Sequence, residues 1–256
     1  MTDRSLGPVL YCGDPHGRFR HIFDAVARTQ ASAVVLLGDL EPKGPLQEEL
    51  TPLIERELPV YFVHGNHDSD SDVLAERVWD GPFASQNIHC RVVTLPDGTR
   101  LAGLGGIFRE SVWHPLSDAA GRGAAGFVCR EDHARATPRQ ERWRGGPPRR
   151  HLSTIYIEEL MGLFDLRADV FVTHEAPGYH PHGIALLDNF ARAMGAKVTV
   201  HGHHHDRLDS SACWERQGFK SFGVGLRGIT AIDIDGRAEV IVPGELDEQR
   251  STREVK

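Results

Sequence analysis

The sequence contains little that would hold the protein in a membrane or stabilise it in an oxidising compartment. It has no uninterrupted run of about 18 apolar residues, the length that a membrane-spanning helix needs. Its N-terminal segment has no long apolar stretch followed by a small-residue cleavage site. The cysteines are scattered and form no C-x-x-C pair; they are Cys12, Cys90, Cys129 and Cys213. We therefore expect a cytoplasmic protein with reduced thiols and no membrane contact.

The chain also lacks an excess of basic charge. Its formal net charge is -7 over 256 residues, which disfavours non-specific binding to nucleic acid. Hydrophobic residues make up 40% and charged residues 25%, a balance that is typical of a globular protein with a substantial core. We expect a single domain over residues 1–245, followed by a polar, frayed tail over residues 246–256.

Short apolar runs alternate with amphipathic segments at the start of the chain. The runs at 8–12, 31–37 and 59–63 predict buried strands. The segment 18–29 has apolar residues at helical spacing, and a second helical segment over 46–54 is interrupted by Pro52. This alternation predicts right-handed βαβ units in a parallel sheet.

The second half of the chain predicts further strands and helices. A hairpin is expected over 88–106, a strand over 168–177 and another over 197–200. Helices are expected from 153, with Ile157, Leu160, Met161 and Phe164 on one face, and over 183–195, with Gly195 as the C-cap. The stretch from 219 to 243 predicts antiparallel strands around a turn at Asp235 and Gly236.

Residues 109–150 are rich in Gly, Pro and Arg and show no helical or strand periodicity. We interpret them as an insertion or a long, partly mobile loop. The part from 119 to 150 would form a mobile cover over a neighbouring cleft and supply positive charge to it. Its arginines are Arg122, Arg130, Arg135, Arg139, Arg142, Arg144, Arg149 and Arg150.

Polar side chains follow five of the predicted strands at the point where each strand ends. They are Asp14 and His16 in GDPHG, Asp39 in GDL, Asn66, His67 and Asp68 in GNHD, His174 in THE, and His203 and His205 in HGHHH. The carboxyl ends of parallel strands meet at one edge of a sheet, so we expect these side chains to lie together. The glycines that precede four of the motifs would let the backbone turn sharply. Carboxylate, amide and imidazole donors without a thiolate suit Mn, Fe, Zn, Co or Ni.

Each of these motifs has a simpler explanation when it is taken alone. An aspartate after a strand is often a helix N-cap, and an isolated buried histidine is often structural. Five such motifs at successive strand ends, closing with four histidines between 201 and 205, favour a metal site instead.

The order D-x-H, G-D, G-N-H-D, H and G-H-x-H resembles the calcineurin-like metallophosphoesterase superfamily. The resemblance implies an α/β fold of four layers, an α/β/β/α sandwich with two central mixed sheets. It also implies two divalent metal ions, with Mn²⁺ favoured over Fe, Zn, Ni or Co. One ion would bind Asp14, His16, Asp39 and His205, and the other would bind Asp39, Asn66, His174 and His203, with Asp39 bridging the two.

The implied reaction is hydrolysis of a small phosphate ester by a hydroxide that bridges the metals. His67 would assist the leaving group as a general acid, and Asp68 would orient His67. His203 and His205 would face the same side of an extended strand end, because side chains alternate with a period of two. His204 would point away, while the role of His201 stays open.

One motif departs from the protein-phosphatase branch of this superfamily. The second motif reads GDLEPKG and lacks the Asp and the phosphate-gripping Arg of that branch, so Arg18, Arg109 or an Arg from 122 to 150 would have to substitute. His180 and His182 are expected to be polar loop residues.

Two other functions remain open at this point: a phosphodiesterase or nuclease that acts on nucleic acid or nucleotides, and a non-catalytic binding scaffold.

Overall fold

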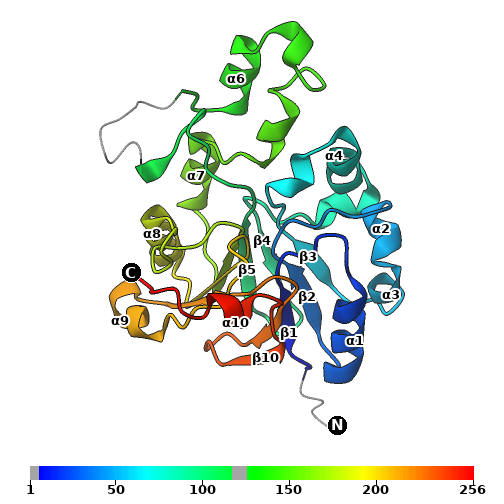
Figure 1. The fold of residues 1–256 in the computed structure, drawn as a ribbon, viewed down its shortest axis with the longest axis vertical. Helices are drawn as coiled ribbons and strands as arrows, with labels where there is room; N and C mark the ends of the chain where they lie inside the picture. Colours follow the sequence, from blue (N-terminus) through cyan, green and yellow to red (C-terminus); the bar gives the residue numbers. More distant parts are fainter. Residues whose placement is uncertain (1–5, 117–125) are drawn as a thin grey trace.

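A computed structural model describes residues 6–116 and 126–256 of the chain. In this part of the chain two β-sheets pack face to face, and helices cover the outer face of each sheet (Figure 1). The α/β/β/α sandwich with two mixed sheets that the sequence predicted is therefore confirmed.

The first sheet is formed mainly by the N-terminal part of the chain. Its strands lie in the order β10 (Ala238–Val242), β9 (Ile229–Ile232), β1 (Val9–Cys12), β2 (Ala33–Leu36) and β3 (Val60–Phe62). β1, β2 and β3 are parallel, as the βαβ pattern predicted, and β9 pairs with β1 in the antiparallel direction.

The second sheet has the order β4 (Val92–Thr94), β5 (Arg100–Leu104), β6 (Val170–Thr173), β7 (Val198–His201) and β8 (Lys220–Gly223). β4 and β5 form the predicted hairpin, while β5 to β8 are parallel. The prediction of antiparallel strands over 219–243 was wrong for β8, which runs parallel to β7. The chain crosses to the first sheet after β8, and only β9 and β10 form the antiparallel hairpin.

Helices lie on both outer faces (Figure 1). On the side of the first sheet they are α1 (Arg20–Thr29), α2 (Leu46–Glu49), α3 (Thr51–Ile54) and α4 (Asp72–Trp79). On the side of the second sheet they are α7 (Ile157–Leu163), α8 (Ala185–Met194) and α9 (Trp214–Gln217). Short 3-10 helices are η1 (His67–Ser69), η2 (Pro82–Gln86), η3 (Arg139–Glu141), η4 (Arg149–Ser153) and η5 (Ser211–Cys213).

Strand alternation explains how one sheet serves two cores. In β1, Leu10 and Cys12 face the helices, while Val9 and Tyr11 face the opposite sheet, because successive side chains point to opposite faces. In helix α7 the buried residues differ from the face that the sequence predicted. Its buried residues are Leu160 and Leu163, and Met161 is exposed.

The described part of the insertion is more regular than the sequence predicted. It contains α6 (Arg130–Ala136), and the side chain of Cys129 caps this helix by accepting the N–H of Asp132. Ion pairs tie it to α4, from Arg144 to Glu76 and Asp80, and from Arg149 to Asp72. Short-range periodicity missed α6 because the helix has seven residues and only one, His133, is buried. Arg122 and its neighbours up to residue 125 lie outside the described residues.

A half-buried polar network joins this insertion to the second sheet. Glu159 accepts hydrogen bonds from Arg130 at 2.8 Å and from the backbone N–H of Tyr156 at 2.9 Å, and it lies 3.4 Å from the His89 ring. Burial acts to lower the pKa of His89, but Cys90 and Glu159 outweigh it and raise that pKa to about 9. Burial acts to raise the pKa of Glu159, but His89 and Arg130 lower it to about 2. Glu159 is therefore charged and paired at neutral pH.

Replacing Glu159 with Gln is expected to lower the free energy of unfolding by about 3 kcal/mol, because it leaves Arg130 and His89 without their shared carboxylate. The contribution of His89 is complete below its unfolded pKa of 6.5 and is lost as the pH rises through about 9. The difference between wild type and variant should therefore shrink between about pH 6 and about pH 10. Denaturant unfolding at both pH values measures it, with exposed Glu158→Gln as the control. Equal losses for the two variants would contradict the prediction.

The tail after residue 245 is held against the body of the protein rather than frayed. It contains α10 (Asp247–Arg250), Arg253 pairs with Asp206 at 2.6 Å, and the Lys256 N–H donates to the Tyr179 carbonyl at 2.8 Å. Among residues 6–116 and 126–256, no helix is long and apolar enough to cross a membrane.

Candidate metal centre

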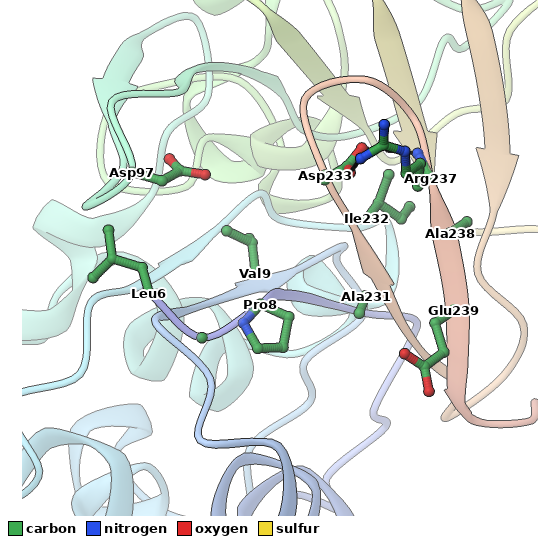
Figure 2. A pocket seen from close by; sticks show the side chains of 11 residues that line it. Leu6, Pro8, Val9, Asp97, Ala231, Ile232, Asp233, Arg237, Ala238 and Glu239 are labelled. Atoms are coloured by element: carbon green, nitrogen blue, oxygen red, sulfur yellow. Dashed lines mark hydrogen bonds and ion pairs between the residues drawn. The ribbon is translucent and has the colours of Figure 1, made fainter. Parts of the chain in front are cut away.

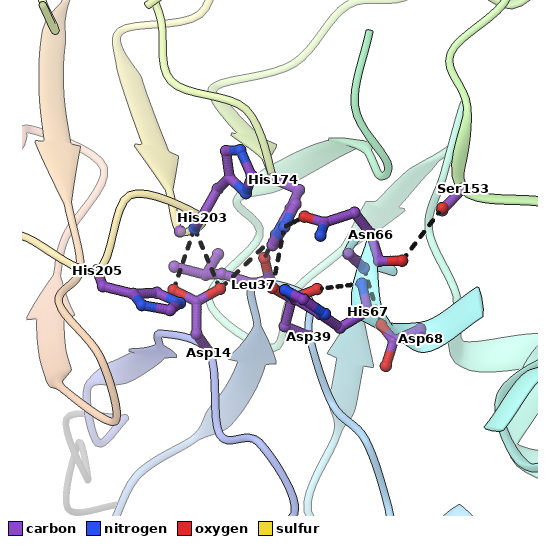
Figure 3. A network of polar contacts seen from close by, with 12 residues as sticks. Asp14, Leu37, Asp39, Asn66, His67, Asp68, Ser153, His174, His203 and His205 are labelled. Carbon is purple, nitrogen blue, oxygen red and sulfur yellow. Dashed lines mark hydrogen bonds and ion pairs between the residues drawn. The ribbon is translucent and has the colours of Figure 1, made fainter. Parts of the chain in front are cut away.

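All seven predicted metal ligands lie together where the carboxyl ends of strands from both sheets meet, and Figure 3 labels all of them except His16. Asp14, His16, Asp39 and Asn66 follow β1, β2 and β3 of the first sheet; His174, His203 and His205 follow β6 and β7 of the second. The sequence predicted one sheet edge, whereas the structure builds the cluster from two sheets.

The ligand atoms form two groups that share one carboxylate. His16, Asp39 and His205 offer donor atoms within 4.8 Å of one another, and so do Asp39, His174 and His203. Asp39 is the residue that the resemblance places between two ions. These oxygen and imidazole donors fit divalent transition metals, so the residues present suit the implied pair of ions.

Asp14 and Asn66 complete the two groups. The Asp14 carboxylate lies 3.8 Å from His174 Nδ1, and the Asn66 side-chain oxygen lies 3.2 Å from His174 Nε2. Asp14 also accepts the backbone N–H of His203 at 3.0 and 3.1 Å, which joins the loop after β1 to the loop after β7. The His174 ring is fixed in turn by the Leu37 carbonyl, 2.7 Å from Nδ1.

The electrostatics of the cluster favour a cation. Burial raises the pKa of Asp14 to about 8, against the opposing charge of His174. Burial also acts to raise the pKa of Asp39, but His174 and the His67 backbone N–H hold it below its usual range. Burial acts to lower the pKa of His174, and Asp39 and Asp14 outweigh it to raise that pKa to about 10. Asp39 and Asp14 thus raise the pKa of His174, and a divalent cation would interact favourably with the same two carboxylates.

Backbone conformation sets the cluster apart from the rest of the loops. Five of the seven predicted ligands have a positive φ, namely Asp14 (34°), His16 (43°), Asp39 (48°), His203 (67°) and His205 (55°). This region is rarely adopted by residues other than glycine and concentrates at functional sites. The expectation of an extended end after β7 was therefore wrong. His203 and His205 reach the cluster through left-handed turns, not through strand alternation.

The glycines before the ligands act mainly by making room. A Cβ on Gly38 would lie 2.3 Å from His174 Nδ1, and one on Gly65 would lie 2.2 Å from an Asp39 carboxylate oxygen. Gly38 has a φ of 104°, so it also provides the sharp turn that the sequence predicted.

Asp68 does not orient His67, so that prediction was wrong. The Asp68 carboxylate is buried and accepts backbone N–H groups of Leu40, Glu41 and Gly65 at 2.8, 3.0 and 2.8 Å. It therefore braces the loops after β2 and β3. The carboxylate that contacts His67 is Asp70, 2.7 Å from Nδ1.

His67 lies at the exposed side of the cluster. Its backbone N–H donates to Asp39 at 2.8 Å, its ring centre lies 5.6 Å from that of His16, and its side chain is 45% exposed. Burial acts to lower the pKa of His67, but Asp39 and Asp70 outweigh it and raise that pKa. Its Nε2 has no hydrogen-bond partner among the described residues, so this atom is free to meet a ligand.

Two carboxylates that the sequence interpretation missed hold histidine rings of the cluster. Asp70 contacts His67, and Glu41 contacts His16 Nδ1. Carboxylates in this position fix the ring orientation and raise the basicity of the opposite nitrogen. Both follow a motif closely, Glu41 two residues after Asp39 and Asp70 three residues after His67, and that spacing was the available signal.

The remaining histidines of the HGHHH stretch have different surroundings. His201 is buried, and its ring contacts the Tyr179 hydroxyl at 2.7 Å and the Gly202 carbonyl at 2.9 Å, so it is a core residue. The His204 ring stacks on His180 with centres 4.1 Å apart. His180 is itself buried beside Asp206, whereas the sequence predicted a polar loop residue.

A separate pocket lies at the opposite end of the first sheet (Figure 2). It is lined by the chain entering β1, including Leu6 and Pro8, and by the β9–β10 hairpin, where Asp233 and Arg237 lie 3.7 Å apart. None of the grouped metal-binding side chains faces this pocket, so the candidate chemistry lies at the carboxyl ends of the strands.

Comparison with known proteins gives a family match and several similar folds. A family model described as calcineurin-like phosphoesterase matches residues 7–207. An uncharacterized protein of Haemophilus influenzae is 34% identical over 228 residues, covering 89% of this chain and 94% of that protein. The crystal structure of TT1561 from Thermus thermophilus has a TM-score of 0.56 and 15% identity, covering 92% of this chain and 98% of that one. A dimetal phosphatase from Danio rerio has a TM-score of 0.47 and 12% identity, covering 92% of this chain and 99% of that one.

Proposed function

The chain belongs to the calcineurin-like phosphoesterase family, and from this premise we propose that it hydrolyses small phosphate esters with two divalent cations. The observation that carries the proposal is the position of Asp39, whose carboxylate is shared by the group with His16 and His205 and the group with His174 and His203. A shared carboxylate between two sets of nitrogen donors is the arrangement that two neighbouring ions require.

Two sets of residues bind the two ions, and two carboxylates fix the histidine rings. Asp14, His16, Asp39 and His205 hold one ion, and Asp39, Asn66, His174 and His203 hold the other. Bound cations lower the pKa of water, so that hydroxide is available near neutral pH, and they offset the charge of a phosphoryl group. Glu41 and Asp70 keep the rings of His16 and His67 in place.

His67 protonates the leaving oxygen of the ester. Its Nδ1 is engaged by Asp70, which leaves Nε2 as the donor, and its half-exposed ring lies at the edge of the ligand cluster. General acid assistance of this kind matters most for leaving groups that are poor on their own.

Side-chain chemistry also supports a proposal for the metal ion, the cellular compartment and the class of substrate. Mn²⁺ is the proposed ion, because oxygen and imidazole donors without thiolate suit it. The four cysteines, all of which the structure describes, are unpaired, which supports a reducing cytoplasm. A nucleic-acid substrate is less favoured because the described insertion arginines are largely engaged by the protein's own carboxylates and carbonyls.

The proposal is tested by removing metal with a chelator and restoring Mn, Ni, Co, Zn or Mg one at a time. We expect about two ions per chain by elemental analysis and hydrolysis of an aryl phosphate ester only after reloading. The substrates are p-nitrophenyl phosphate as the monoester and bis-p-nitrophenyl phosphate as the diester. A protein that binds two ions but hydrolyses neither ester would be a binding scaffold, and the proposal would be wrong.

A further inference from the structure

Several arginines of the insertion already have a carboxylate partner. Among the described residues these include Arg130 with Glu159, Arg144 with Glu76 and Asp80, and Arg149 with Asp72. Arg18, one of the substitutes considered for the missing phosphate-binding arginine, is exposed and lies 3.8 Å from Glu245. Within residues 6–116 and 126–256, Arg109 forms no ion pair with a carboxylate, so its charge is not neutralised by a direct contact.

The position of Arg109 is fixed by its backbone. It follows β5, and its carbonyl accepts the N–H groups of Val112 and Trp113, both at 2.8 Å. Its guanidinium donates from Nη2 to the Ser153 hydroxyl at 3.3 Å, whereas its Nε is buried and has no hydrogen-bond partner among the described residues. Because a buried N–H is costly when it is unpaired, this donor points to an acceptor that arrives with a ligand.

The surroundings of Arg109 place it beside the metal centre. Ser153 Oγ lies 3.4 Å from the Asn66 carbonyl, and Figure 3 shows Ser153 on the Asn66 side of the cluster. The preceding residue, Phe108, donates its N–H to Glu175 at 3.2 Å, and Glu175 groups with His203 within 4.8 Å. Arg109 therefore stands between the loop that carries Asn66 and the residues next to His203.

A second arginine, Arg150, meets the same serine, because its backbone carbonyl accepts a hydrogen bond from Ser153 Oγ at 3.3 Å. Burial and the charge of Arg150 lower the pKa of Arg109, while Asp70 and Glu175 act in the opposite direction. Arg150 is exposed, and its Nε donates to His151 at 3.0 Å rather than to a carboxylate. Two positive charges on this side of the cluster favour the binding of an anion.

We infer that Arg109 binds the non-bridging oxygens of the substrate phosphoryl group and that this contact makes the site prefer phosphate monoesters. The inference rests on the proposed function and deepens it by naming the substrate class. It also assigns to Arg109 the phosphate contact for which the GDLEPKG motif has no arginine.

The chemistry of the two ester classes explains the preference. A monoester presents three non-bridging oxygens that share two negative charges at neutral pH. In a diester one of these oxygens carries a second alkyl or aryl group, and only one negative charge remains. A planar guanidinium fork matches two charged oxygens of a phosphoryl group, so its contact is stronger with the monoester.

The test compares metal-loaded wild type with Arg109→Gln, Arg109→Lys and, as control, Arg135→Gln, an exposed arginine of α6 that pairs with Asp132. Titration calorimetry measures the Kd of inorganic phosphate, and kcat/KM is measured for p-nitrophenyl phosphate and bis-p-nitrophenyl phosphate. In Arg109→Gln we expect phosphate binding and monoester kcat/KM to fall by about 10- to 100-fold, and diester kcat/KM by less than about threefold. Arg109→Lys should recover part of the loss, and Arg135→Gln should match wild type.

Metal content and melting temperature accompany each variant. Unchanged phosphate affinity in Arg109→Gln with both ions retained would overturn the inference, and equal losses for monoester and diester would overturn the preference. If Arg109→Gln does not fold, Arg109→Lys carries the comparison, because it keeps the charge and loses the fork. A wild type that binds phosphate through Arg109 but hydrolyses neither ester would reject the proposed function and leave the Arg109 site standing.

Discussion

Asp39→Asn is expected to lose both metal ions and to reduce kcat/KM by at least about 10³-fold, the upper range for loss of one electrostatic stabiliser in an active site. The substitution keeps the shape of the side chain and an oxygen for the His67 N–H, so the loops should stay in place. It removes the negative charge that both ligand groups share, and with it the charge that retains two cations. Elemental analysis and kcat/KM for p-nitrophenyl phosphate measure the two effects.

The matched control is Asp24→Asn on α1, where the carboxylate is exposed and belongs to no ligand group. It should keep about two ions and full activity. Retention of both ions by Asp39→Asn would show that the carboxylate does not bridge them. Loss of one ion only would assign Asp39 to a single site.

His67→Ala should keep both ions and the fold while kcat on an alkyl phosphate falls by about 10²- to 10⁴-fold, the usual value of general acid help. For an aryl phosphate the loss should be much smaller, because a phenolate leaves without a proton. His67 is suited to this comparison, since within the described residues its hydrogen bond to a predicted ligand comes from its backbone N–H and not from its ring.

The measurement is kcat on a matched aryl and alkyl pair, with metal content checked in each protein. His21→Ala, a half-buried histidine on α1, is the control and should behave as wild type. Equal losses on both substrates would mean that His67 positions the phosphoryl group. Asp70→Asn should reproduce part of the alkyl-specific loss, because it weakens the contact that fixes the ring.

The parts of the fold that could be predicted are those determined by residues that lie close together in the sequence. β1 and β2 are buried on both faces, so short apolar runs mark them, and the C-cap at Gly195 is a local requirement for a positive φ. The direction of β8 is not local. The direction depends on which sheet the strand joins. Buried and half-buried residues alternate along β8, and this pattern is compatible with either direction.

The distinction between local and non-local determinants also applies to the candidate metal centre. The side chains that gather in the cluster could be selected from the motifs, but the partner of His67 could not. Residues 67–69 form a 3-10 turn, in which side chains three positions apart lie on one face, so Asp70 meets His67 and the adjacent Asp68 points into the protein. Sequence adjacency suggested Asp68, whereas the turn geometry selects Asp70.

The hydrogen bonds from His203 to Asp14 have a consequence for how the chain folds. They join residues 189 positions apart, and His174 reaches Leu37 across 137. Contacts of such separation form late, because closing a long loop costs entropy before any contact repays it. The ligand cluster therefore matures only after both sheets have docked, and partly folded chains offer just fragments of it. Metal ions that bind this cluster would therefore select the finished protein and stabilise it against unfolding, so that the stability of the native state would depend on the supply of metal.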